Sequence, residues 1–132
     1  MTHITKPFFL MDDDPQYNFI NKILLKRSFE KVLINDFTSP EEGLAFIKSQ
    51  FINNPTDEKT TLFLDINMPT MSGWEFLEAF EQFDASIKDQ YNIYILSSSI
   101  NLSDIDRAKA HPLVLDFLEK PLYKETLLKI FD

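Results

Sequence analysis

The chain has 132 residues, with 13 basic and 21 acidic side chains and a formal net charge of -8, and its length is that of a single domain. The acidic balance argues against direct nucleic-acid binding, which needs clustered Lys and Arg, and the absence of cysteine excludes disulfides, thiolate metal sites and cysteine nucleophiles. There is no apolar run near the ~20 residues of a membrane span and no signal peptide, so we expect one soluble cytoplasmic domain, residues 1–132, without a membrane partner.

Short apolar runs alternate with longer amphipathic segments along the chain. The first run, residues 8–11, predicts a buried strand. A helix is predicted from Pro15 to about Ser28, because Asp14 is a favourable N-cap and proline is favoured in the first turn. The apolar residues at helical spacing in this segment are Ile20, Ile23 and Leu24.

The middle of the chain repeats this alternation. Residues 32–34 predict a second strand, and a capping box with proline begins a helix at Ser39. The apolar stripe of that helix is Leu44, Ile47 and Phe51. A polar loop is expected over 53–60, before a third strand at 62–64. A second capping box at Ser72 then begins a helix with Phe76, Phe80 and Phe83 on one face.

The last part of the chain predicts two more strands and two more helices. The strands are residues 93–96 and 114–118. The helix between them, 103–110, ends before Pro112, because proline disfavours the helical conformation of the preceding residue. A short helix over 123–131 is expected to turn Leu127, Leu128 and Phe131 inward.

Five strands therefore alternate with five helices. Four of the five strand runs are continuously apolar, which is typical of strands that are covered on both faces. The pattern predicts an α/β domain with a five-stranded parallel sheet, doubly wound, with helices on both faces. Such sheets bind ligands at the carboxyl ends of their strands.

Polar side chains occupy those carboxyl ends. The first strand ends at Asp12-Asp13, the third at Asp65, the fourth at Ser97 and the fifth at Lys120. Three carboxylates at one edge repel one another unless a cation lies between them. Oxygen ligands favour Mg²⁺ or Ca²⁺ over zinc, and a small acidic cluster suits Mg²⁺. With a hydroxyl and a lysine to face phosphoryl oxygens, the pattern indicates phosphoryl transfer, with Asp65 as the nucleophile that forms an acyl phosphate.

At these residues the chain resembles the receiver domain of two-component response regulators. The matching motifs are Phe9–Asp14, Leu64–Gly73, Leu96–Ser98 and Glu119–Pro121, and their order and spacing fit the family across nearly the whole chain. The Asp-x-x-Met-Pro-x-Met-x-Gly stretch that begins at Asp65 is highly specific. The resemblance implies a flavodoxin-like sheet.

The resemblance also implies roles for the acidic residues. Asp65 would accept a phosphoryl group from a histidine kinase or a histidine phosphotransfer protein. Asp13 would bind Mg²⁺ directly and Asp12 largely through water. Asp65 and the backbone carbonyl of Asn67 would complete the set of protein ligands.

Three further residues match the switch machinery of the family. Ser97 would move to hydrogen-bond the phosphoryl group, and Lys120 would pair with it. Phe117 falls at the position of the aromatic switch residue, although the glycine often found before that residue is missing. Serine replaces the commoner threonine at position 97 and keeps the hydroxyl. The expected output is a change in the surface of residues 103–110, 114–118 and 123–131 that another protein reads.

The main interpretation is a stand-alone signalling switch that is not an enzyme, because the chain ends within a residue or so of the last helix. A degenerate receiver that acts only as a protein-binding module is the alternative, and the intact Asp12, Asp13, Asp65 and Lys120 count against it. An aspartyl-phosphate phosphatase is a third interpretation. That chemistry normally needs a second acid two residues after the nucleophile, and this chain has Asn67 there.

Overall fold

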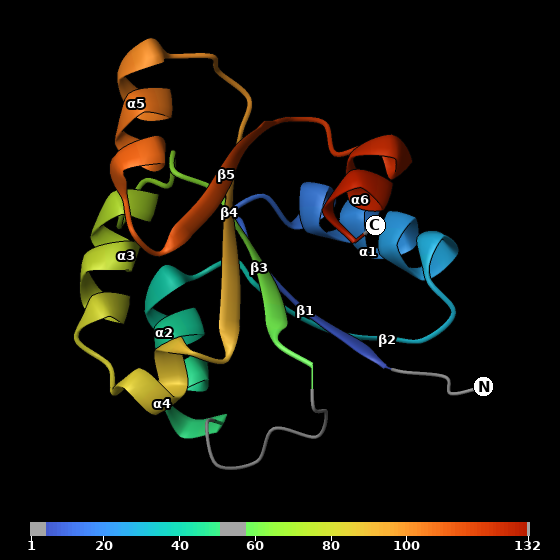
Figure 1. Cartoon of the computed structure of the whole chain (residues 1–132), viewed down its shortest axis with the longest axis horizontal. Coiled ribbons are helices and arrows are strands. Elements are labelled where there is room, and N and C mark those ends of the chain that lie inside the picture. The colour runs from blue at the N-terminus through green and yellow to red at the C-terminus, as the bar shows by residue number, and fades with distance from the viewer. Residues whose placement is uncertain (1–4, 51–57, 132) are drawn as a thin grey trace.

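Among the residues that the computed structural model describes, 5–50 and 58–131, five parallel strands form one sheet with the order β2-β1-β3-β4-β5 (Figure 1). The strands are β1 (Lys6–Met11), β2 (Val32–Phe37), β3 (Thr60–Leu64), β4 (Tyr91–Ser97) and β5 (Val114–Glu119). The helices are α1 (Pro15–Ser28), α2 (Pro40–Gln50), α3 (Gly73–Glu81), α4 (Ala85–Lys88), α5 (Leu102–Ala110) and α6 (Lys124–Ile130). The predicted doubly wound α/β fold is confirmed.

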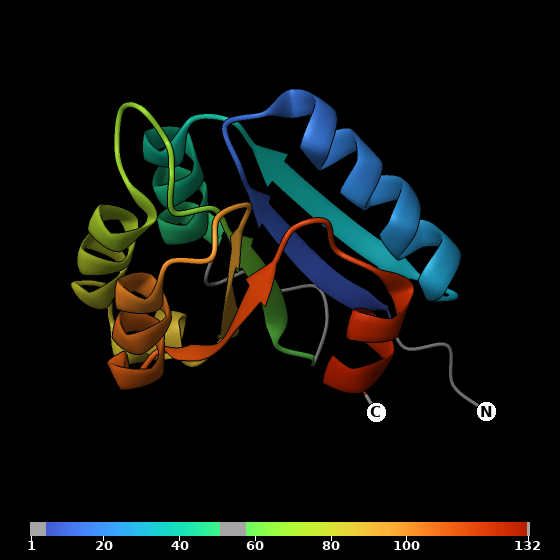
Figure 2. The same ribbon diagram turned by 90° about the horizontal axis from the view of Figure 1, so that it is seen from above.

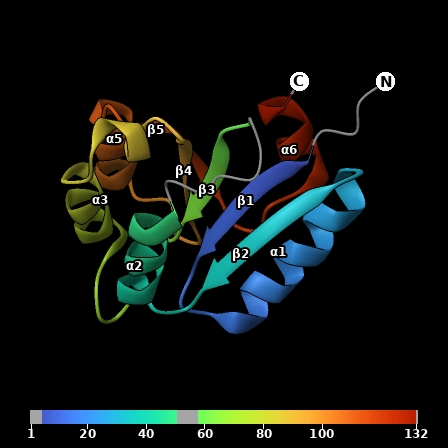
Figure 3. The same cartoon turned by 90° about the horizontal axis from the view of Figure 1, so that it is seen from below.

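The helices cover both faces of the sheet. Helices α1 and α6 lie on one face, and α2, α3 and α5 lie on the other (Figure 2). Figure 3 shows the same layers from below, with β2 beside α1 at the edge of the sheet. Because β1 pairs with β2 on one side and with β3 on the other, the chain reverses its winding direction at β1.

The side chains of β1 show how the two faces are filled. Phe8 and Leu10 pack in the cluster under α1 and α6, while Phe9 and Met11 pack in the cluster under α2, α3 and α5. All four side chains are at most 1% exposed. The continuously apolar run is therefore explained by a central strand whose successive side chains enter two separate cores.

The helix starts that border the carboxyl edge are capped as expected. The Asp14 carboxylate accepts hydrogen bonds from the backbone N–H groups of Gln16 and Tyr17, at 2.9 and 3.4 Å. Ser72 and Glu75 form the predicted capping box at the start of α3. These caps fix where α1 and α3 begin, and hence the path of the two loops that carry the acidic residues.

Three sequence expectations about the helices are wrong. Ile20 and Ile23 are 57% and 37% exposed, because α1 turns Asn18, Asn21 and Leu25 toward the sheet instead. Leu128 is 51% exposed, although its neighbour Leu127 is buried. A sixth helix was also missed. The four-residue α4 is too short to show a hydrophobic period, and of its side chains only Ile87 is buried.

Two expectations fall partly or wholly on residues without a described placement. Phe51, predicted in the stripe of α2, lies outside the described residues, as does most of the predicted loop 53–60. Thr60 belongs to β3, so the strand begins earlier than the apolar run indicates. Across the described part of the chain, none of the helices is long and apolar enough to cross a membrane.

Candidate functional site

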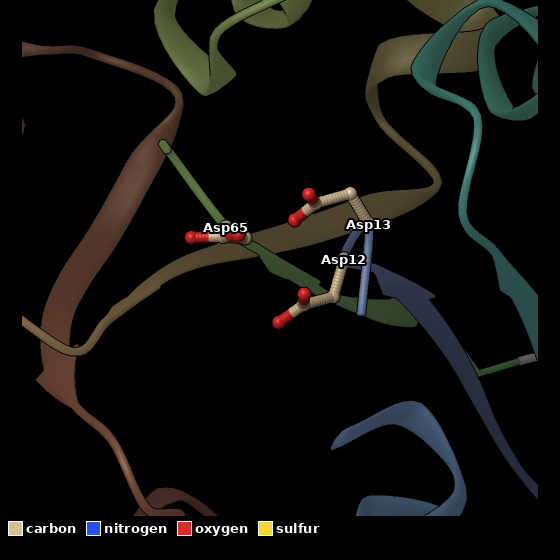
Figure 4. Close-up of side chains that lie close together, drawn as sticks. All are labelled: Asp12, Asp13 and Asp65. Atoms are coloured by element: carbon tan, nitrogen blue, oxygen red, sulfur yellow. The ribbon is translucent and has the colours of Figure 1, made fainter. Parts of the chain in front are cut away.

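The acidic residues meet where β1 and β3 end side by side. Met11 pairs with Leu64 in the parallel register, and the Asp65 N–H donates to the Met11 carbonyl at 2.9 Å. Asp12, Asp13 and Asp65 therefore leave the sheet together (Figure 4). One carboxylate oxygen of each lies within 4.8 Å of the others. The predicted convergence of the three carboxylates is a consequence of strand register.

Burial and mutual repulsion make Asp65 an unusual carboxyl group. Asp12 and Asp65 are each 5% exposed, and Asp13 is half-buried. Desolvation, followed by the charge of Asp12, raises the pKa of Asp65 to about 6, although Lys120 acts in the opposite direction. The ionised cluster is therefore electrostatically unfavourable without further positive charge, which is the condition that favours cation binding.

Lys120 supplies one positive charge to the acidic cluster. Its Nζ lies 2.6 Å from Asp12 Oδ2 and 3.8 Å from Asp65 Oδ1. The Lys120 N–H donates to the Ser97 carbonyl at 2.8 Å, which fixes the end of β5 against the end of β4. Burial lowers the pKa of Lys120, but the hydrogen bond and charge of Asp12, together with Asp65, outweigh burial and raise it. The ammonium therefore stays charged.

Ser97 is brought to the same edge, with its hydroxyl turned into its own loop. The side chain is fully buried. Its Oγ donates to the Ser99 carbonyl at 3.1 Å and accepts from the Ser99 N–H at 3.2 Å. To reach a group on Asp65 the hydroxyl must exchange these bonds for new ones. The loop that would respond leads directly into α5.

The loop after β3 folds tightly beneath the site. Asn67 is exposed, and its N–H donates to Asp65 Oδ1 at 3.2 Å. Gly73 approaches so closely that an added Cβ would lie 2.7 Å from both the Asp65 carbonyl oxygen and the Ile66 Cα. The Gly73 N–H donates to the Ile66 carbonyl at 3.0 Å. The glycine of the specific motif is thus required by backbone contact, since any side chain there would displace the loop.

Phe117 lies away from the carboxylates, on β5. Its half-buried ring packs against the core cluster that includes Ala108 of α5. In the sheet, Phe117 pairs with Ile95 of β4. This position connects the strand that precedes Lys120 with the helix that follows the Ser97 loop.

Two residues of α1 that border the site were missed by the sequence analysis. The buried Asn18 amide donates to the Asp12 carbonyl at 3.0 Å and to the Phe37 carbonyl at 3.3 Å. The Tyr17 ring lies below the Lys120 ammonium, with 4.4 Å between Nζ and the ring centroid. The available signal was the repeat of polar side chains at helical spacing, Tyr17, Asn18 and Asn21, on a helix that must cover a sheet.

The donor set fits a hard divalent cation. The cluster offers carboxylate oxygens from Asp12, Asp13 and Asp65. Oxygen donors without imidazole or thiolate suit Mg²⁺. A cation held by this cluster would add its positive charge to that of the Lys120 ammonium, whose Nζ lies 3.8 Å from Asp65 Oδ1. That is the electrostatic arrangement needed to bind and transfer a phosphoryl group.

Comparison with known proteins agrees with this geometry. The family model described as response regulator receiver domain matches residues 8–132. A response regulator receiver protein from Dyadobacter fermentans is 26% identical with a TM-score of 0.82, over 96% of this chain and 98% of that one. A two component response regulator from Cytophaga hutchinsonii is also 26% identical, with a TM-score of 0.85, over 98% of this chain and 96% of that one.

A more distant neighbour supports the fold alone. A chemotaxis protein from Vibrio cholerae is 23% identical with a TM-score of 0.73, and 96% of each chain is covered. A search of curated proteins gives no match.

Proposed function

The chain belongs to the family of response regulator receiver domains, and from this membership we propose that it is the phosphoacceptor switch of a two-component phosphorelay. Receiver domains are generally signalling switches and not classical enzymes. The observation that carries the proposal is the meeting of three carboxylates within 4.8 Å, with the Lys120 Nζ 3.8 Å from Asp65 Oδ1. Asp65 is the proposed acceptor, because it begins the family-specific motif and its carboxylate lies near both the other two carboxylates and the Lys120 ammonium.

The proposed reaction is transfer from a phosphohistidine of a histidine kinase or a histidine phosphotransfer protein. An Asp65 carboxylate oxygen attacks the phosphorus, and a new O–P bond forms as the P–N bond breaks. The electron pair of that bond stays on the imidazole nitrogen, which takes a proton from solvent. Asp65 must be ionised to attack, and with a pKa of about 6 it is mostly ionised at neutral pH.

The other residues of the site have distinct tasks. Mg²⁺, held by Asp12, Asp13, Asp65 and the Asn67 carbonyl, would neutralise charge on the phosphoryl oxygens. Lys120 would form an ion pair with the phosphoryl group. Asn67, which stands where a phosphatase would carry its second acid, cannot act as a general acid, because its amide group has no acidic proton for a leaving group. We therefore expect the phosphoryl group to leave Asp65 slowly, without the multiple turnover of a phosphatase.

The proposed signal leaves through Ser97 and Phe117. The Ser97 hydroxyl exchanges its bonds to Ser99 for a bond to the phosphoryl group, and this pulls the loop that begins α5. Phe117 packs against the same core cluster as α5, so its ring adjusts with the helix. The surface of α5, β5 and α6 would then present a different shape to a downstream protein in the cytoplasm.

Intact mass spectrometry after incubation with acetyl phosphate tests the proposal. The native chain should gain one phosphoryl group in the presence of Mg²⁺ and none in EDTA. Asp65→Asn should abolish the gain, whereas Asp106→Asn, an exposed aspartate on α5, should keep it. A folded native chain that binds Mg²⁺ but gains no phosphoryl group, even from a phosphorylated histidine domain, would contradict the proposal and favour a binding module.

A further inference from the structure

Tyr17 connects the start of α1 with the connection between β5 and α6. Its ring faces the Lys120 ammonium, with Nζ 4.4 Å from the ring centroid. Its hydroxyl accepts a hydrogen bond from the Leu122 N–H at 3.1 Å. One side chain therefore touches the ammonium of Lys120 and also holds the backbone two residues further along.

The surroundings of Tyr17 keep both contacts in place. The backbone of Tyr17 is tied to the Asp14 cap, and the Asn21 side chain also hydrogen-bonds its hydroxyl. Leu122, the donor to that hydroxyl, is 6% exposed. Burial raises the pKa of Tyr17, despite the hydrogen bonds from Leu122 and Asn21, so the phenol stays neutral. The ammonium thus meets the π face of an uncharged ring, which is the arrangement of a cation–π contact.

A contact of this kind restrains Lys120, because its long side chain can form an ion pair with either of two carboxylates. Its Nζ is 2.6 Å from Asp12 Oδ2 but 3.8 Å from Asp65 Oδ1. A lysine without further restraint can follow either carboxylate or turn to water, since its stem has four rotatable bonds. The Tyr17 ring closes a third side of the ammonium and leaves it between Asp12 and Asp65.

We propose that Tyr17 is a positioning residue for phosphoryl transfer, which holds Lys120 at the place where the phosphoryl oxygens arrive. The inference rests on the proposed function and assigns it a residue outside the motifs that identify the family. Tyr17 acts through Lys120 and touches no reacting atom. Its ring contacts the Lys120 ammonium, and its hydroxyl accepts a hydrogen bond from the backbone of the β5–α6 connection.

The rate of phosphorylation by acetyl phosphate at saturating Mg²⁺, followed by intact mass, separates the two parts of the side chain. Tyr17→Leu removes the ring and should slow the reaction about tenfold, because a misplaced charge loses much of its effect on the transition state. Tyr17→Phe keeps the ring and should stay within about threefold of the native rate. Phe19→Leu makes the same kind of change at an exposed position on α1 and should leave the rate unchanged.

A double-mutant comparison shows whether Tyr17 acts through Lys120. In a Lys120→Ala background, Tyr17→Leu should cause no further loss of rate. An equal loss in both backgrounds would overturn the inference, because the effect would then be general and structural. A native rate for Tyr17→Leu would overturn it as well.

A second measurement on the unphosphorylated chain keeps the inference separate from the proposed function. Because the Lys120 Nζ lies 4.4 Å from the Tyr17 ring centroid, the NMR signals of the neighbouring Hε protons should be shifted upfield in the native chain and in Tyr17→Phe. The shift should vanish in Tyr17→Leu. Absence of the shift in the native chain would refute the contact even if phosphorylation is observed. Its presence in a chain that accepts no phosphoryl group would refute the proposed function alone.

Discussion

Asp65→Asn should stabilise the protein when no divalent cation is present, although it removes the proposed acceptor. In the folded chain burial and the charge of Asp12 raise the pKa of Asp65 from 3.8 to about 6. At about 1.36 kcal/mol for each tenfold change in acidity, this corresponds to about 3 kcal/mol against the folded state. Solvent screening at the open edge of the sheet reduces that figure, so we expect a gain of about 1–2 kcal/mol in the free energy of unfolding.

The pH dependence of this effect has a definite sign. Below pH 3.8 Asp65 is protonated in both states and contributes nothing. Between 3.8 and about 6 the unfolded chain releases the proton while the folded chain keeps it, so stability falls as the pH rises. Above this window the penalty is complete. The free energy of unfolding of Asp65→Asn should therefore exceed that of the native chain by an amount that grows from pH 4 and levels off above pH 7.

Urea denaturation in EDTA at several pH values measures this difference. Asp106→Asn is the matched control, because it removes one negative charge at an exposed position of α5. Added Mg²⁺ should narrow the difference in the free energy of unfolding, since the folded native chain keeps all three carboxylates and is stabilised more by the cation than the variant is. A variant that is less stable than the native chain in EDTA at pH 7.5, or a difference that does not depend on pH, would refute this account of the site's electrostatics.

Three further substitutions probe the site. Gly73→Ala should cost about 2–3 kcal/mol in urea denaturation, because its Cβ would lie 2.7 Å from the Ile66 Cα, which cannot move freely. Gly43→Ala is the matched change in α2. It should lower the free energy of unfolding by less than about 1 kcal/mol, since the new Cβ would lie 2.8 Å from the Met11 sulfur, which belongs to a flexible side chain. Equal losses of stability for the two variants would contradict the argument. Lys120→Met should tighten Mg²⁺ binding about tenfold in calorimetry, because it removes a positive charge beside the carboxylates, and weaker binding would contradict that reasoning.

The carboxyl edge was predictable because parallel register follows from the strand pattern. Once residues 8–11 and 62–64 are adjacent parallel strands, the residues that follow them must leave the sheet at the same edge. Met11 pairs with Leu64, so Asp12 and Asp65, the next residues after the two strands, leave the sheet side by side. The sequence could not show the 2.6 Å contact between Lys120 and Asp12, since several rotamers of a lysine reach the same edge.

The inner face of α1 was not predictable from apolar residues. Ile20 and Ile23 face outward, whereas the buried Asn18 satisfies the carbonyls of Asp12 and Phe37. A polar residue can take a core position when its side chain bonds backbone carbonyl groups there, and a hydropathy pattern does not reveal such bonds. The contact of Tyr17 with Leu122, 105 residues apart, is likewise invisible to local spacing.

The contacts of Trp74, on the other face of the sheet, were likewise not predictable from the sequence. Its side chain is half-buried. Its Nε1 donates to Asp104 at 3.2 Å, and the Arg107 guanidinium lies 4.6 Å from its ring centroid. These contacts join α3 to α5 across 30 residues of sequence, and only the packed fold brings the partners together.

Locating the phosphoryl group on the chain tests the central claim most directly. After incubation with acetyl phosphate and Mg²⁺, borohydride reduction converts an acyl phosphate on aspartate to homoserine, which peptide mass spectrometry can place. The account predicts homoserine at position 65, and none at Asp12 or Asp13. Modification at either of those two aspartates, or a phosphoryl group on a histidine, would contradict it.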